Sequence, residues 1–145
     1  MADWGKKRKA DLLAQMALFS SLSRRQLAQV TDVTVADELP AGTVLTRQGA
    51  SGGIAYILAS GRAEVLRGGR RLAVLGPGDV VGELSLIDGK PRSATVKAVT
   101  DLEVLEIDAR DLTRLLRKAP AVTLKLLEAL AERLRQADAL PAAGL

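Results

Sequence analysis

The chain has 145 residues and a formal net charge of +4, a length that suggests one compact domain with a substantial core. It contains no histidine and no cysteine, which excludes Cys/His zinc sites, Ser-His-Asp triads, thiol nucleophiles, iron–sulfur clusters and disulfide-stapled scaffolds. Only 2% of its residues are aromatic, too few for a base-stacking surface on single-stranded nucleic acid.

The N-terminal residues carry a basic cluster made of Lys6, Lys7, Arg8 and Lys9. These four charges equal the net charge of +4, so the rest of the chain is close to neutral. We expect a solvated tail, with a weak contact to an acidic partner, an anionic membrane or, least favoured, a nucleic acid as the functional alternative. No apolar run approaches the ~18 residues that span a bilayer, and no signal peptide is recognisable, so we expect a cytoplasmic location.

Two helices are predicted before the middle of the chain. Apolar residues recur at helical spacing in residues 7–18, and residues 19–21 interrupt the pattern. Ser23 and Gln26 then have the spacing of a capping box, which predicts a short second helix ending near residue 30.

From about residue 32 to about residue 108 the pattern changes to short strands separated by turns. Strand-like runs occur at residues 33–35, 43–46, 54–58, 63–66, 72–75, 94–99 and 102–107. Gly68 and Gly69 separate two of these runs, which indicates a hairpin. The spacing predicts an antiparallel β roll of about eight strands, of the double-stranded β-helix or jelly-roll type.

Helical spacing returns after Asp108, which is a good N-cap for a helix ending near residue 118. Pro120 is well placed to start a second helix that continues to about residue 138. The apolar stripe of this helix consists of Leu124, Leu127, Leu130 or Ala131, and Leu134. We therefore predict an α+β fold, in which the β roll is flanked by N-terminal helices and by two C-terminal helices.

Residues 81–96 have the composition of an anion site. After a short strand, residues 82–87 can form one helical turn whose first backbone N–H groups are free to face a ligand. Gly82 would let a ligand approach that backbone closely, and Arg92 offers a planar pair of donors to a phosphate. Glu83 suits two neighbouring hydroxyls or Arg92 itself. The alternative is a surface Glu–Arg pair on a helical connection.

Two stretches of this segment resemble the phosphate-binding cassette of cyclic nucleotide-binding domains: GELSL at residues 82–86 and KPRSAT at residues 90–95. Four further stretches resemble other signatures of that family, at residues 18–23, 42–49, 56–61 and 76–82. The resemblance covers roughly residues 18–134. It implies a basic arm and helix at 1–17, a cyclic nucleotide-binding domain at 18–138 and a tail at 139–145. Within the domain, the roll would span about 32–108 and the C-terminal helices about 109–138.

The resemblance implies a role for each residue of the cassette. Arg92 would bind the exocyclic phosphate oxygens, and Glu83 would bind the ribose 2′-hydroxyl. The remaining contacts are expected from Gly82, which gives access, from the backbone N–H groups of Leu84 and Ser85, and from the Ser93 hydroxyl on the phosphate or the base.

The sequence departs from the family pattern in its aromatic residues. Val81 stands where the family often has an aromatic, and the terminal helix has none. A lid over the base would therefore have to come from Leu130, Arg133 or Leu134. We expect Trp4 and Tyr56 to be packing residues rather than base contacts.

The function implied is that of a sensor that binds cyclic AMP, with cyclic GMP as the alternative ligand, and no cofactor is expected. A second hypothesis is a β-roll interaction scaffold that no longer binds nucleotide. The intact set Gly82, Glu83, Arg92 and Ser93 argues against it. An enzyme that hydrolyses cyclic nucleotides is disfavoured, because such enzymes usually hold metals with histidines and this chain has none.

A sensor must relay ligand binding to an output. The relay is predicted to run from Leu86 and Ile87 on the cassette turn to leucines of the helix after the roll, namely Leu112, Leu115 and Leu116. Too few residues follow Leu134 for a helix-turn-helix DNA-binding domain, so we expect the output in a partner chain or in a larger protein. The terminal helix could alternatively pair weakly with a second copy through Leu127 and Leu134.

Overall fold

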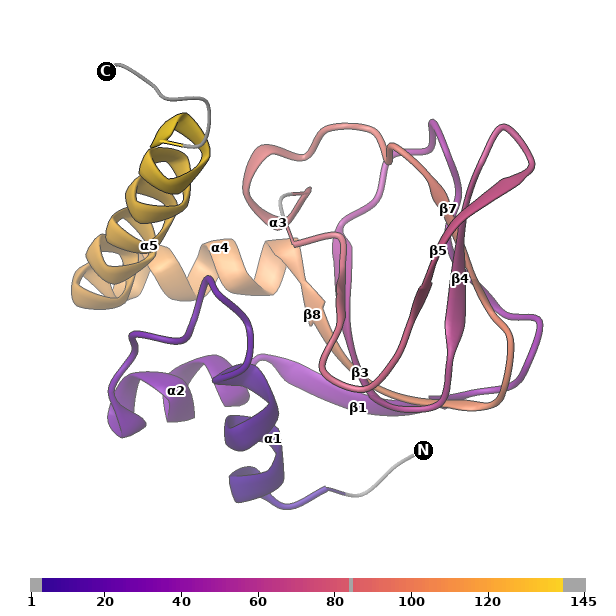
Figure 1. Cartoon of the computed structure of the whole chain (residues 1–145). Coiled ribbons are helices and arrows are strands. Elements are labelled where there is room, and N and C mark those ends of the chain that lie inside the picture. The colour runs from indigo at the N-terminus through magenta and orange to yellow at the C-terminus, as the bar shows by residue number, and fades with distance from the viewer. Residues whose placement is uncertain (1–3, 84, 140–145) are drawn as a thin grey trace.

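The computed structural model describes residues 4–83 and 85–139, and its architecture confirms the predicted β roll. Two four-stranded antiparallel sheets face one another, and helices lie at both ends of the chain (Figure 1). In strand order, the first sheet is β1 (Thr34–Leu39), β8 (Leu102–Asp108), β3 (Ile54–Ser60) and β6 (Val80–Val81). The second is β2 (Val44–Thr46), β7 (Thr95–Ala98), β4 (Ala63–Arg67) and β5 (Arg70–Leu75).

The predicted hairpin joins β4 to β5. Gly68 and Gly69 form its turn with φ of 59° and 80°, a conformation that residues with a Cβ rarely adopt. Because β5 pairs only with β4, it forms one edge of the second sheet.

The helices are α1 (Lys6–Leu13), α2 (Arg24–Thr31), α3 (Ser85–Asp88), α4 (Ala109–Lys118) and α5 (Pro120–Ala139). The predicted capping box is confirmed at the start of α2, where the Ser23 hydroxyl accepts from the Gln26 backbone N–H at 3.2 Å and the Gln26 side chain accepts from the Ser23 N–H at 3.0 Å. The predicted N-cap of α4 is confirmed as well, since the Asp108 carboxylate accepts from the Arg110 N–H at 2.8 Å.

The predicted end of the first helix was wrong. Helix α1 ends at Leu13 rather than near residue 18, and the chain continues through short turns. In the first of these the N–H of Met16 donates to the carbonyl of Leu13 at 3.0 Å. The turns place Met16, Leu18 and Phe19 in the core, where each is fully buried. Burial of three large side chains therefore outweighs continuation of the helix.

The core has two parts. One lies between the helices and the outer face of the first sheet, and it includes Leu13, Phe19, Ile57, Leu105, Leu112 and Leu126. The other lies inside the roll and includes Leu58, Val96 and Val104. The predicted packing role of Trp4 is confirmed, since its ring is buried in the first part. Tyr56 is half-buried against the second part.

Helix α5 buries a different face from its leucine stripe. Val122 and Leu126 are buried in the core that the helices share with the first sheet, whereas Leu124, Leu127 and Leu134 are exposed. In Figure 1 this helix stands at the end of the helical half of the molecule, with one side turned away from the roll. Among the described residues, no helix is long and apolar enough to cross a membrane.

Candidate functional site

A cavity of about 510 Å³ opens between the inside of the roll and α5. Most of the predicted site residues meet in its wall, namely Gly82, Glu83, Ser85, Arg92, Ser93 and Arg133. Apolar side chains from the roll complete the wall, among them Val65, Val81 and Val96. Segments far apart in the sequence thus bring two of the predicted cations, Arg92 and Arg133, to the same space as the Glu83 carboxylate and the two serines.

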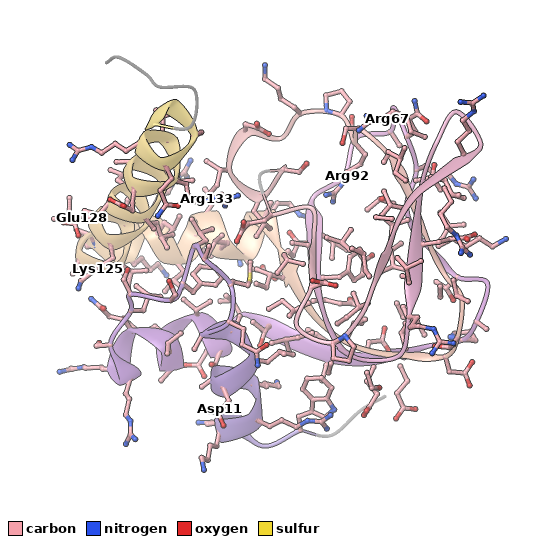
Figure 2. The ribbon with its side chains drawn as sticks, in the orientation of Figure 1. Asp11, Arg67, Arg92, Lys125, Glu128 and Arg133 are labelled. Carbon is pink, nitrogen blue, oxygen red and sulfur yellow. The ribbon has the colours of Figure 1, made fainter. Side chains whose placement is uncertain are left out.

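Three of the predicted residues are not placed in this wall. Leu84 lies outside the described residues. Leu130 packs against the core and Leu134 is exposed, and neither lines the cavity. Of the three candidates for a lid, the structure brings only Arg133 to the site (Figure 2).

Arg92 is a buried cation with few partners. Its side chain comes from the loop before β7 (Figure 2), and the residue is 7% exposed. Nη2 donates to the carbonyl oxygen of Ile54, but Nε and Nη1 have no hydrogen-bond partner among the described residues. Burial lowers the pKa of Arg92 from its ordinary value, yet a guanidinium remains charged at neutral pH. A buried charge without a partner is costly, so this site favours an anion.

Two glycines make room for this guanidinium. A Cβ atom on either Gly52 or Gly82 would overlap with atoms of the Arg92 side chain. Gly82 also has a φ of +81°, which few other residues adopt. Gly82 was expected to give a ligand access to the backbone, and it accommodates Arg92 as well. The sequence analysis missed the role of Gly52. The only signal for it in the sequence is that Gly52 lies in a glycine-rich loop.

Glu83 is held from both ends of the chain. Its side chain is 14% exposed, and Oε1 lies 2.5 Å from Nη1 of Arg133 on α5. Oε2 accepts a long hydrogen bond of 3.4 Å from the backbone N–H of Leu18. The sequence analysis considered neighbouring hydroxyls or Arg92 as partners of Glu83. The pairing with Arg92 is wrong, because Glu83 pairs with Arg133 instead. That pairing joins residues on separate elements, which no local sequence pattern indicates.

The loop between α3 and β7 is fixed by its own hydrogen bonds. The Asp88 carboxylate accepts from the Lys90 N–H at 3.0 Å, and Gly89 ends α3 with a φ of 65°. On the far side, the carbonyl of Ser93 accepts from Nε of Arg67 at 3.1 Å. Ser93 and Arg92 both line the cavity.

A pair of carboxyl groups lies on the inner face of the first sheet, near Tyr56. Glu106 on β8 is directly opposite Tyr56 on β3. Burial and the neighbouring Asp37 raise the pKa of Glu106 to about 7. Burial, followed by the charge of Glu106, also raises the pKa of Tyr56. The sequence analysis missed this cluster, because its members lie on three different strands.

Comparison with known proteins assigns the chain to a family. The family model described as "Cyclic nucleotide-binding domain" matches residues 36–119, more than half of the chain. The chain belongs to this family. The match spans α3 and the cassette and continues through α4, and the outer boundaries predicted at residues 17 and 138 stay a prediction.

Two curated relatives indicate the kind of protein in which such domains occur. The cyclic AMP receptor protein of Thermus thermophilus is 43% identical over 104 residues, which are 68% of this chain and 48% of that protein. The cAMP-dependent protein kinase regulatory subunit of Aspergillus fumigatus is 38% identical over 110 residues, which are 72% of this chain and 26% of that protein. The chain therefore spans half or less of the length of these relatives.

Solved structures share the fold. The N-terminal domain of a transcriptional regulator from Streptomyces coelicolor matches with a TM-score of 0.81 and 36% identity, covering 88% of this chain and 92% of that one. The regulatory domain of Toxoplasma gondii PKA, crystallised with cAMP, matches with a TM-score of 0.71 and 33% identity, covering 82% and 48%. The domain is thus a cyclic nucleotide-binding domain by sequence and by architecture.

Proposed function

We propose that this domain binds cyclic AMP in the cavity between the roll and α5, and that binding regulates an output outside the described fold. One observation carries the proposal: buried Arg92, with two donor nitrogens lacking a partner among the described residues, shares a cavity of about 510 Å³ with Glu83. A cyclic nucleotide supplies the partner that Arg92 lacks, a phosphate anion, and adds a ribose hydroxyl that can donate to Glu83.

The other cavity residues have supporting roles in this proposal. Ser85 is proposed to offer its backbone N–H to the phosphate, and Ser93 its hydroxyl to the phosphate or the base, whereas the role predicted for Leu84 stays a prediction. Arg133 lies where the nucleotide would leave the roll, so it is our candidate for the lid. The names of the two curated relatives favour cyclic AMP over cyclic GMP as the ligand.

The relay is proposed to use two routes. Through Glu83, the ribose acts on Arg133 and hence on α5, because one carboxylate holds both. Through Leu86, movement of α3 acts on α4, since Leu86 and Leu112 are buried in the same core and the two helices are in contact. Ile87, also named in the predicted relay, is exposed and does not take part in that packing.

The output is proposed to lie in a partner chain or in a further part of a larger protein, as in relatives that are longer than this chain. The domain itself is proposed to regulate rather than catalyse, since the matched relatives are named as a receptor and a regulatory subunit. Pairing of two copies through α5 belongs to the same proposal, because Leu127 and Leu134 are 58% and 65% exposed.

Isothermal titration with cyclic AMP, cyclic GMP and 5′-AMP tests the proposal. We expect cyclic AMP to bind best, and 5′-AMP to bind at least ~10-fold more weakly because its open dianionic phosphate does not fit a monoanion cradle. Tighter binding of cyclic GMP would change the ligand but keep the sensor. If none of the three nucleotides binds, the proposal fails and the hypothesis of a scaffold that does not bind nucleotide is favoured.

Replacement of Arg92 separates binding from stability. In Arg92→Met we expect nucleotide affinity to fall by ~100-fold or more, because the phosphate loses its charged donor. The ligand-free variant should nevertheless be more stable by about 1 kcal/mol, which raises Tm by roughly 2–4 °C, because a buried unpaired cation is removed. Calorimetry and thermal unfolding measure the two effects. Unchanged nucleotide affinity would contradict the assignment of Arg92.

A further inference from the structure

A second hollow lies on the other side of α3 from the nucleotide cavity. This groove has a volume of about 460 Å³, and its two walls are α3 and α4. Ser85 and Asp88 line both the groove and the cavity. Helix α3 has only four residues, and it separates the groove from the cavity.

The α4 wall of the groove is basic. Arg110, Arg114 and Arg117 are spaced four and three residues apart, which places them on one face of the helix, and all three line the groove. Arg110 pairs with Asp108 at 3.3 Å and Arg114 pairs with Asp111 at 3.2 Å. Exposed ion pairs of this kind are weak, so an incoming carboxylate can replace them.

The remaining arginine and the α3 wall add to this surface. Arg117 has no ion pair within the described part of the chain, and Lys118 follows it in the last turn of α4. On the opposite wall Ile87 is 45% exposed, although it lies beside the buried Leu86. A cationic row facing an exposed isoleucine matches a segment that carries carboxylates along one side and an apolar residue on the other.

We propose that this arginine groove docks an acidic, amphipathic peptide segment of the protein that the domain regulates, and that docking is coupled to the nucleotide through α3. The coupling rests on the proposed function, whereas the docking does not. A peptide fits better than duplex nucleic acid, because it can place its carboxylates along α4 and its apolar side against Ile87, whereas a duplex would also bring phosphates against Asp88 on the α3 wall.

The docking is tested with a synthetic capped peptide in which glutamates lie along one side of a helix and two leucines, four residues apart, lie on the other. The peptide is titrated into the isotope-labelled full chain and the binding surface is mapped by NMR. We expect the largest shifts in residues 85–89 and 109–118. Largest shifts elsewhere, no binding, or equal binding of a peptide with lysine in place of every glutamate would overturn the docking.

Charge reversal in the groove provides the matched comparison. The double variant Arg114→Glu/Arg117→Glu should weaken the peptide by ~10-fold or more. The control Arg62→Glu/Arg70→Glu changes the net charge equally on the roll, far from α4, and should have an effect below ~2-fold. Circular dichroism verifies that both variants remain folded. Equal weakening by both, or displacement of the peptide by a short DNA duplex that binds more tightly, would overturn the docking.

Coupling is measured by repeating the titration with saturating cyclic AMP. We expect the peptide affinity to change by ~5-fold or more, and the cyclic AMP affinity to change by the same factor when the peptide is present. Unchanged peptide affinity in a chain that binds cyclic AMP would overturn the coupling alone. If cyclic AMP does not bind, the proposed function fails, and the docking is decided by the NMR map and the charge-reversal variants.

Discussion

Glu83 and Arg92, two charged side chains of the cavity wall, are in opposite situations. Within the described part of the chain, Glu83 has two partners, Arg133 and the N–H of Leu18, whereas Arg92 has one partner and two donor nitrogens, Nε and Nη1, without any. A ligand therefore gains most at Arg92 and adds a further hydrogen bond at Glu83. Pairing a buried, unpaired charge lowers the free energy more than exchanging one hydrogen bond for another. The phosphate should therefore contribute most of the affinity, and the ribose should contribute less.

Gly52 offers a matched test of how Arg92 is positioned. Gly52→Ala should lower cyclic AMP affinity by ~10-fold or more, because its Cβ would displace the guanidinium. Gly53→Ala is the control, since a Cβ there would meet only the Ala109 side chain at 3.9 Å, an ordinary contact. Neither glycine has a φ in the left-handed region. Calorimetric titration measures both variants, and equal affinities would contradict the positioning role.

These residues also show what the sequence could predict at this scale. Arg92 and Glu83 were identifiable because a short motif carries them. Gly52 and the Glu83–Arg133 pair were not, because each depends on a contact between elements 40 or more residues apart in the chain, such as the separation of 50 residues between Glu83 and Arg133.

At the scale of elements, locally coded features were predicted correctly. The capping box of α2, the N-cap of α4 and the β4–β5 hairpin each depend on residues close together in sequence. The end of α1 and the buried face of α5 were not predicted, because both depend on which side chains the distant sheet and helices can accept. Tertiary packing overrides local periodicity at both places.

The strands β1, β3 and β8 give the domain a pH-dependent stability. Glu106 has a pKa of about 7 against an ordinary 4.5, so the folded chain binds more protons than the unfolded chain between those values. The free energy of unfolding should therefore fall as the pH rises through this window. Thermal unfolding at about pH 5 and about pH 8 should show a drop in Tm of a few degrees, to which other groups also contribute.

A variant isolates the contribution of Glu106. Glu106→Gln stays neutral at every pH and should flatten the dependence, whereas Glu38→Gln, an exposed carboxyl on β1, should leave it in place. An equal pH dependence in Glu106→Gln and the parent chain would contradict the assignment of the raised pKa.

Helix α5 should respond to ligand through Arg133. We expect cyclic AMP to change amide hydrogen exchange in residues 126–136 of the parent chain, because the ribose and Arg133 share one carboxylate. In Arg133→Ala this response should be lost while affinity changes by less than ~10-fold. Arg135→Ala, an exposed arginine on the same helix, is the control. A response confined to the cassette in the parent chain would leave a binder without this relay.

At the scale of the whole molecule, the helices lie on one side of the roll and the ligand cavity is at their junction with it (Figure 1). The N–H of Leu18 and the side chain of Arg133 reach Glu83 from opposite ends of the chain. The fold class was predictable from strand spacing and helical periodicity. How the two helical segments converge on one carboxylate was not, since it requires the assembled structure.

The exposed leucines of α5 predict weak self-association. At about 0.1 mM we expect a monomer–dimer equilibrium in analytical ultracentrifugation, because two heptads bury little surface. Leu127→Lys/Leu134→Lys should be monomeric and should keep its cyclic AMP affinity. A parent chain that stays monomeric at that concentration would contradict pairing through α5.

The position of the Arg92 side chain beside Gly52 and Gly82 has a practical consequence for measurements of nucleotide affinity. A buried guanidinium with free N–H groups attracts small oxyanions as well as nucleotides, so phosphate or sulfate in a buffer should compete for the same place. A competitor at about 100 times its own dissociation constant lowers the apparent nucleotide affinity ~100-fold. Affinities measured in phosphate should therefore be weaker than those in chloride at equal ionic strength, and variants are comparable only within one buffer.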